Sequence, residues 1–235
     1  MRRTTPGVFS PAPSSSVLPW PVDVIEGALE PLILPERLAR FDAVARARLA
    51  SVVVALEGII DPHNTAAILR SADAFGVGEL HFIDLGVRPL LAKRITRGTE
   101  RWLDVHLHHD STRCVEGLKA RGFEVFVADA RATVSLDDIA ARPQVAVVFG
   151  NEHQGATAAT RAAATGTFAI PMRGLVESLN VSVAAAITLQ CVTGHRPGDL
   201  GPRETRALRA RFLLESVREH ALVIDRYLRD QRAGS

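Results

Sequence analysis

The sequence predicts an α/β domain built around a largely parallel sheet with helices on both faces. Residues 51–56 are a continuous apolar run rich in β-branched residues, which indicates a strand buried on both faces, and residues 80–84, 123–128 and 145–149 are predicted to be further strands. Helical patterns separate these runs, as they do where helices connect parallel strands. At 235 residues and 47% hydrophobic content, the chain can bury a full core. We therefore expect one main domain with extensions.

The N-terminal segment, residues 1–34, is predicted to be a flexible extension. Residues 1 to 22 are rich in proline and contain a run of three serines, a composition that cannot pack a core. Residues 22–34 are more apolar and fit an arm that packs on the domain. The opening Met1-Arg2-Arg3 lacks the apolar core of a signal peptide, and no segment approaches membrane-spanning length. We expect a cytoplasmic protein without a membrane contact.

The main domain is expected to span residues 35–194 and to begin with a helix at 35–49, which opens with proline and glutamate. After the strand at 51–56, Asn64 is predicted to cap the next helix. Counting 100° per residue, Ile68 and Leu69 fall on one side of that helix and Arg70 nearly opposite, among alanines. Arg70 should therefore be open to approach.

Residues 86–101 are strongly basic, with one acid, Glu100. Such a loop can grip backbone phosphates, although a plain solvated loop has the same composition. Three histidines follow at 106, 108 and 109, with no carboxylate or cysteine at ligand spacing, so we predict no metal site. Cys114 and Cys191 lack CxxC spacing and are predicted to be small core residues.

The remaining elements follow in the same alternating order. We expect helices at 111–121 and 156–164, a helical turn at 137–140, a last strand at 167–170, and one long helix at 203–229 in a C-terminal helical extension, residues 195–235. The arginines of that extension alternate with acids, which favours a solvated helix, with an RNA-facing or dimer-facing role as the alternative.

Three stretches carry the chemistry. Residues 170–189 pass from a strand end through a Pro/Gly turn into a helix, with Ser178 and Asn180 at its entry. Helix entries favour electron-rich ligand groups, although either residue alone fits a simple helix cap. Residues 145–155 form a buried strand that breaks into a glycine-flanked loop carrying Glu152. Residues 56–76 contain Asn64 and Arg70.

In this order, these stretches resemble the three motifs of the SpoU (TrmH) family of S-adenosyl-L-methionine-dependent RNA ribose 2′-O-methyltransferases, in the SPOUT superfamily. The resemblance covers roughly residues 37–190. It implies a C-terminal trefoil knot, an exception to the rule that chains do not thread loops, and a homodimer with the cofactor pocket near the interface. The absence of GxGxxG after the first strand argues against a nicotinamide site.

The resemblance also implies roles for particular residues. The catalytic group would be Arg70, Asn64, Glu152, Ser178 and Asn180. The cofactor S-adenosyl-L-methionine would contact Ala128, Phe149, Gly150, Asn151, Ile170, Met172, Gly174 and Leu179. RNA would contact Arg37 and Arg40 of the helix at 35–49, although these two residues also fit a solvated helix face. The basic loop would supply further RNA contacts, which are Arg88, Lys93, Arg94, Arg97 and Arg101.

The substrate is less sharply defined. A tRNA guanosine in the D-loop, of the position-18 type, is the first expectation, with a 23S rRNA ribose as the enzymatic alternative. A knotted RNA-binding protein that no longer methylates belongs to a different class. Gly58 and Asp61 depart from the usual Asn and Lys of the tRNA-modifying members, on the side expected to face RNA. Lys93 and Lys119 are the only lysines, and this preference for arginine fits either RNA binding or a high-GC genome.

Overall fold

The computed structural model describes residues 18–83 and 98–233, and it contains a six-stranded sheet in which all described pairings are parallel. The strand order is β3-β2-β1-β5-β4-β6. The strands are β1 (Leu49–Glu57), β2 (Val77–Ile83), β3 (Asp104–His108), β4 (Glu124–Ala128), β5 (Val145–Phe149) and β6 (Gly166–Phe168). The predicted fold class is confirmed; the knot stays a prediction.

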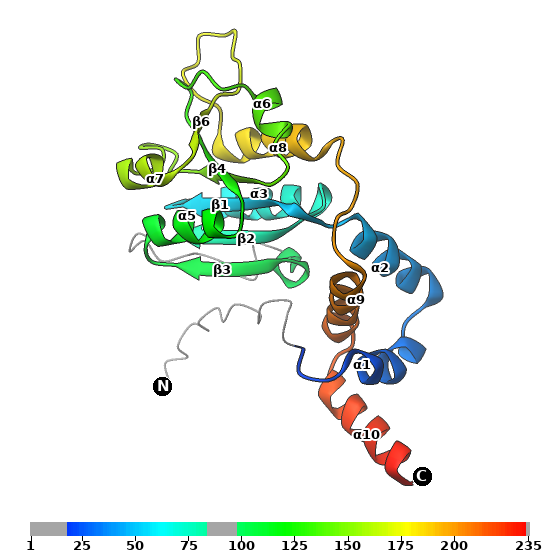
Figure 1. Cartoon of the computed structure of the whole chain (residues 1–235). Helices are drawn as coiled ribbons and strands as arrows, with labels where there is room; N and C mark the ends of the chain where they lie inside the picture. The colour runs from blue at the N-terminus through cyan, green and yellow to red at the C-terminus, as the bar shows by residue number, and fades with distance from the viewer. Residues whose placement is uncertain (1–17, 84–97, 234–235) are drawn as a thin grey trace, which may run out of the picture.

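Helices cover both faces of the sheet, as Figure 1 shows. The described helices are α1 (Val22–Leu29), η1 (Glu30–Leu32), α2 (Pro35–Ala47), α3 (Pro62–Ala74), η2 (Thr99–Trp102), α5 (Ser111–Ala120), α6 (Leu136–Ala140), α7 (Ala158–Ala163), α8 (Val181–Thr193), α9 (Pro202–Ser216) and α10 (His220–Ala233). Helices α3, α6 and α8 pack on one face, and α5 and α7 pack on the other. Two apolar cores result, one on each side of the strands.

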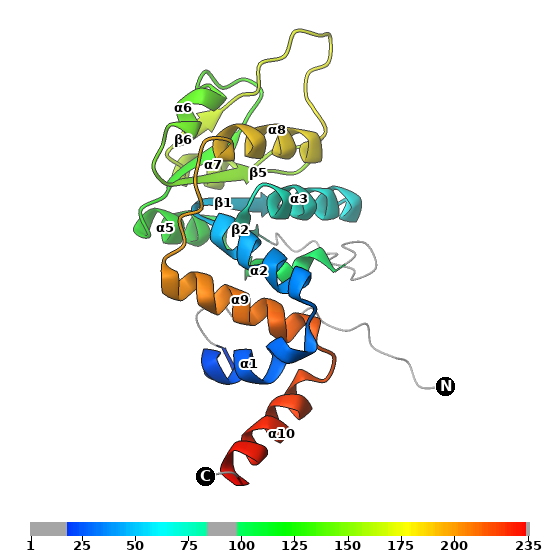
Figure 2. The same ribbon diagram turned by 90° about the vertical axis from the view of Figure 1, so that its right-hand side faces the viewer.

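A third apolar cluster joins the two ends of the chain. Helices α1, α2, α9 and α10 pack around Phe41, Leu213 and Ile224 beside the sheet domain (Figures 1 and 2). Within the predicted N-terminal extension, α1 is therefore ordered, with Ile25 and Leu29 fully buried. The predicted helix at 203–229 is wrong as a single element, because the chain turns between α9 and α10, where Glu219 has φ 55°.

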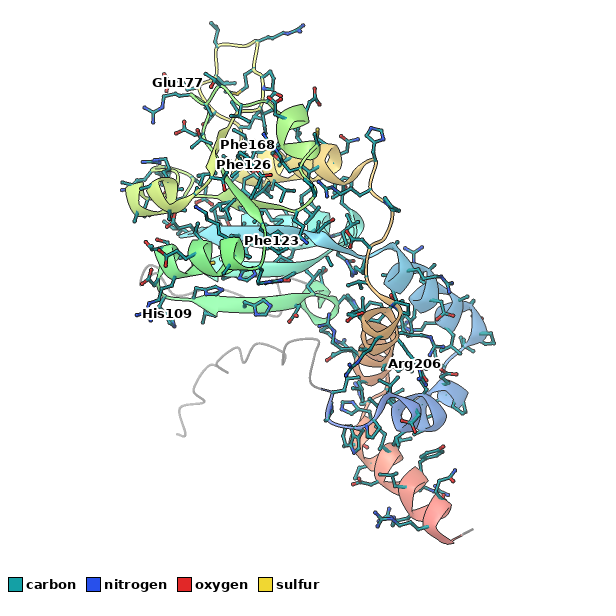
Figure 3. The ribbon with its side chains drawn as sticks, viewed as in Figure 1. His109, Phe123, Phe126, Phe168, Glu177 and Arg206 are labelled. Carbon is teal, nitrogen blue, oxygen red and sulfur yellow. The ribbon has the colours of Figure 1, made fainter. Side chains whose placement is uncertain are left out.

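Ion pairs reinforce this helical cluster. Arg209 bonds to Asp42 of α2 and to Glu30 of η1, and Arg206 bonds to Glu26 of α1. Figure 3 shows Arg206 within this group of helices. For Arg209, whose side chain is 16% exposed, the prediction of a solvated helix is wrong, whereas Arg206 is exposed as predicted and pairs with Glu26 at the surface. None of the helices in residues 18–83 and 98–233 combines the length and apolarity that a membrane span requires.

One buried arginine connects the helical cluster to the sheet domain. Arg48, between α2 and β1, is 1% exposed and donates to the carbonyls of Val77 and Trp102. Its guanidinium also pairs with Asp73 of α3 at 2.5 Å. A buried charge is tolerated when it is paired and hydrogen-bonded, as the two Nη atoms of Arg48 are, so this residue fixes where α2 meets the sheet.

Candidate functional site

A cavity of about 810 Å³ lies where β4, β5 and β6 end. Ligands of parallel α/β sheets bind beyond the carboxyl ends of the strands, and this volume suits a cofactor-sized molecule. The segment between β6 and α8 closes one side and projects from the domain in both views (Figures 1 and 2). Figure 3 places Glu177 on that projecting segment and Phe168 in the body of the domain beneath it.

The loop after β5 is held in a tight shape. Asn151 and Gly155 exchange backbone hydrogen bonds, and the Asn151 side chain accepts from the amide of His153 at 2.8 Å. The amide of the same side chain donates to the carbonyl of Gly58 at 2.9 Å, which ties the loop to the end of β1. A Cβ on Gly150 would lie 2.0 Å from the backbone nitrogen of Ala156, so only glycine fits there.

Glu57, at the end of β1, anchors the far side of this loop. Its side chain is 1% exposed and accepts from the amide of Thr157 at 2.8 Å and from the hydroxyls of Thr157 and Thr160, at 2.9 and 2.5 Å. Thr157 is also the N-cap of α7. The carboxylate therefore fixes the point where the cavity loop becomes a helix.

Three predicted site residues from three motifs are joined by hydrogen bonds. The amide of Asn64 donates to Glu152 Oε1 at 2.8 Å, and the amide of Asn180 donates to Asn64 Oδ1 at 3.1 Å. Asn180 Oδ1 accepts from the amide of Ser182 at 2.9 Å, so Asn180 caps α8 as predicted. Asn64 does not cap α3; Asp61 does, with Pro62 in the first turn. The side chain of Asn64 is thereby free to link the other two.

The described lining contains most of the predicted cofactor residues: Ala128, Phe149, Gly150, Asn151, Ile170, Met172 and Leu179. It also contains Glu152, Ser178 and Asn180. Asn64, Arg70 and Gly174 are not among the described lining residues. Asn64 reaches the site through its two hydrogen bonds, whereas Arg70 is exposed on α3, as its helical position predicted.

The sequence did not predict four charged residues of the lining, which are Asp129, Arg131, Arg161 and Glu177. Asp129 follows Ala128 directly, so its position at a strand end was the available signal. The amide of Arg131 donates to the Asp129 carboxylate at 3.0 Å, and this hydrogen bond lowers the pKa of Asp129 below its ordinary value. Asp129 thus offers the cavity an ionised acceptor.

The predicted RNA contacts lie away from the cavity lining where they are described. Arg37 and Arg40 are exposed on α2, and Arg37 donates to the hydroxyl of Ser216 at 3.3 Å. Arg101 donates to the carboxylate of Glu215 in α9 at 3.0 Å and stacks on Trp102, so its charge is partly used within the protein. Arg88, Lys93, Arg94 and Arg97 lie outside the described residues.

The cavity combines apolar walls with one unmatched acceptor. Ile170, Met172 and Leu179 offer apolar surface. Glu152 Oε2 is buried without a hydrogen-bond partner among the described residues. A buried oxygen of this kind is costly unless a ligand donor or a positive charge meets it. The arrangement therefore suits a ligand that has both an apolar part and a cationic or hydrogen-bond-donating part.

Comparisons with known proteins agree on one family. Residues 51–190 match the model of the SpoU rRNA Methylase family. The chain is 36% identical over 154 residues to the tRNA (guanosine(18)-2′-O)-methyltransferase of Thermus thermophilus. The matched region covers 65% of this chain and 79% of that protein. The crystal structure of the A. aeolicus TrmH/SpoU tRNA modifying enzyme superposes with a TM-score of 0.70 and 26% identity, over 78% of this chain and 98% of that chain. An AdoMet-bound rRNA methyltransferase from Sinorhizobium meliloti shares the fold, with a TM-score of 0.57 and 23% identity, over 66% of this chain and 60% of that chain.

Proposed function

Because this chain belongs to the SpoU rRNA Methylase family, an RNA methyltransferase family, we propose that it methylates the ribose 2′-hydroxyl of a tRNA guanosine, of the position-18 type in the D-loop. The observation that carries the proposal is the hydrogen-bonded set Asn64, Glu152 and Asn180, which joins three distant segments at one cavity. We further propose that the protein works in the cytoplasm, where tRNA is found.

The cavity residues fit S-adenosyl-L-methionine as the cofactor, which when bound supplies the methyl group. Gly150 lets the loop backbone approach a ligand closely, and the apolar residues suit an adenine ring. Glu152 Oε2 offers a buried negative charge toward which the sulfonium side of the cofactor can lie. Ionised Asp129, at the end of β4, can accept from ribose hydroxyls.

The chain's own part in the reaction is to bind and align. Methyl transfer is an in-line displacement, so the acceptor oxygen must be held within a narrow angle of the donor. Asn64 and Asn180 hold Glu152 in place through the two bonds described above. Arg70 lies on α3 six residues beyond Asn64, about 9 Å along the helix, and faces solvent.

We assign Arg70 to charge stabilisation and not to proton abstraction. A guanidinium keeps its proton in proteins, so it serves poorly as a base. A charged Arg70 can hold a phosphate of the RNA and stabilise negative charge that develops on the 2′-oxygen. Arg70→Ala should abolish turnover while cofactor affinity stays within a few-fold of the wild-type value. Arg113→Ala, in an exposed arginine of α5, is the matched control. Loss of cofactor binding in Arg70→Ala, measured by calorimetry, would contradict this role.

The substrate assignment is tested with labelled cofactor. Purified protein incubated with total tRNA and with 23S rRNA should label the tRNA, and mapping of the 2′-O-methylated nucleotide should place it at a D-loop guanosine. Label on a 23S rRNA ribose would support the enzymatic alternative. Bound cofactor without methyl incorporation would support a knotted RNA-binding protein that has lost catalysis.

We also propose that the chain forms a homodimer through α8 and the segment before it. Leu175 and Val176 are exposed on that segment, at 105% and 63%, and Val183 and Ile187 are exposed on α8, at 45% and 38%. Exposed large apolar side chains on two consecutive elements suggest a surface that another molecule covers. Light scattering should give twice the chain mass, and Val183→Glu should reduce it to the chain mass. The trefoil knot belongs to the same proposal.

A further inference from the structure

A second cluster of ligand-type side chains lies away from the cavity, on the β2–β3 side of the sheet. It consists of His81 from β2, His108 from β3 and Cys114 from α5. One ligand atom of each lies within 4.8 Å of the other two. His81 is 5% exposed and Cys114 is 3% exposed, so the cluster is largely closed to solvent. The predicted methyl transfer uses none of these residues.

The two histidines face each other through nitrogen atoms. His81 Nδ1 lies 2.7 Å from His108 Nε2, and the rings stack with their centroids 4.9 Å apart. The buried thiol of Cys114 belongs to the apolar core between the sheet and helices α5 and α7, and it lies beside this pair of histidines. The sequence analysis considered His106, His108 and His109 as possible ligands. It did not predict that His81 of β2 and Cys114 of α5 lie next to His108.

The carboxylate of Glu79 orients His81. His81 Nε2 lies 2.7 Å from Glu79 Oε1, and Arg121 donates two hydrogen bonds to the same carboxylate, at 2.5 and 2.8 Å. When His81 Nε2 carries the proton, Nδ1 keeps its lone pair and faces His108 and Cys114. A histidine whose other nitrogen donates to a carboxylate is the usual arrangement around protein-bound zinc.

From this geometry we propose a zinc site formed by His81 Nδ1, His108 Nε2 and Cys114 Sγ, with water as the fourth ligand. Tetrahedral zinc has bonds of about 2.0 Å to nitrogen and about 2.3 Å to sulfur, which separates its ligand atoms by about 3.3 to 3.6 Å. To reach this geometry, the two histidine nitrogens must move apart from their present 2.7 Å. Bound zinc would connect the edge strand β3 to β2 and to α5.

An overlapping group, Glu79, His81 and His106, also brings ligand atoms together. We favour the cysteine-containing group because Glu79 is already held by Arg121, whose positive charge opposes a cation on that carboxylate. His106 lies 3.8 Å from Glu79 and 3.6 Å from Asp104, so it has acidic neighbours of its own. The two groups predict different mutational results.

The test uses the full-length protein, stripped with a chelator and titrated with zinc in competition with a chromogenic chelator. We expect one zinc ion per chain in the wild type. Cys114→Ser and His108→Asn should lose it, while Cys191→Ser and His109→Asn, in a cysteine and a histidine outside the cluster, should keep it. Glu79→Gln should bind about tenfold to a hundredfold more weakly, as expected when a partner of a ligating histidine is changed.

Cobalt provides a readout in the wild-type protein itself, before any residue is changed. Co²⁺ bound to the wild type should show the charge-transfer absorption of a thiolate bond, and Cys114→Ser should lack that band. His106→Asn should retain both the zinc and the cobalt band. No metal retained by the wild type, equal loss in the control variants, or loss in His106→Asn with retention in Cys114→Ser would each overturn the proposal.

Discussion

The carboxylate of Glu57 gives the sharpest quantitative test of how the cavity is built. In Glu57→Gln, the amide oxygen can still accept from the two threonine hydroxyls, but the amide nitrogen then faces the N–H of Thr157. Two donors cannot pair, so the buried N–H is left unsatisfied, at a cost of about 1–3 kcal/mol. The two hydroxyl bonds also lose their charge assistance, about 1 kcal/mol each.

Part of this lost stability is offset, because the neutral amide of Gln at position 57 does not carry the cost of burying a charge. We therefore expect a net destabilisation of about 2–4 kcal/mol. For a chain of this size, 1 kcal/mol shifts the thermal midpoint by about 2–4 °C, so the midpoint should fall by roughly 5–15 °C. Cofactor affinity should fall with it, because the loop from Gly150 to Ala156 loses its anchor at Thr157.

Urea unfolding and calorimetry measure the two effects on the same protein. Glu116→Gln, in an exposed glutamate of α5, is the matched control and should leave both quantities unchanged. Thr160→Val removes one of the two hydroxyl donors and should give a smaller loss than Glu57→Gln. An unfolding free energy of Glu57→Gln within about 0.5 kcal/mol of wild type, the range of ordinary surface changes, would show that the Glu57 carboxylate does not anchor the loop.

Two further predictions concern one contact of the site and one contact outside the cavity lining. Asn64→Ala removes both hydrogen bonds that link Glu152 to Asn180 through Asn64. We expect turnover in a methyl-transfer assay to fall at least about tenfold, equivalent to about 1.4 kcal/mol. Unchanged turnover would show that Asn64 is not needed for catalysis. Burial and then the charge of Asp137 raise the pKa of the Cys191 thiol, so this cysteine should react slowly with iodoacetamide at pH 8. Asp137→Asn lowers that pKa and should speed the alkylation, as followed by mass spectrometry; an equal rate would show that Asp137 does not act on the thiol.

Much of the sheet domain was predictable because its signals are local. Buried parallel strands appear as apolar runs, and Arg70 was correctly placed on the exposed side of α3 from helical periodicity alone. The cap of α8 by Asn180 followed from residue type and position in the same way. Asn64 shows the limit of this reasoning, because Asp61 is an equally good cap three residues earlier and takes that place.

The helical cluster was not predictable, because its signals are not local. Arg206 and Arg209 lie in a segment of mixed charge, which is typical of a solvated helix, yet their partners Glu26, Glu30 and Asp42 come from the other end of the chain. The contact between His81 and His108 was not predicted for the same reason, because the two residues lie 27 positions apart in different strands. Pairings between distant segments have no periodic pattern, so residue spacing cannot reveal them.

The packing of α1 against α9 and α10 also determines how the protein can be shortened. A fragment that ends before residue 202 would leave Ile25, Leu29 and Phe41 without most of their apolar neighbours, and one that starts after residue 30 would uncover Leu208 and Leu213. Either fragment should expose an apolar surface and aggregate, although both fragments keep the entire sheet. The first and last helices thus behave as one unit that must be kept or removed together.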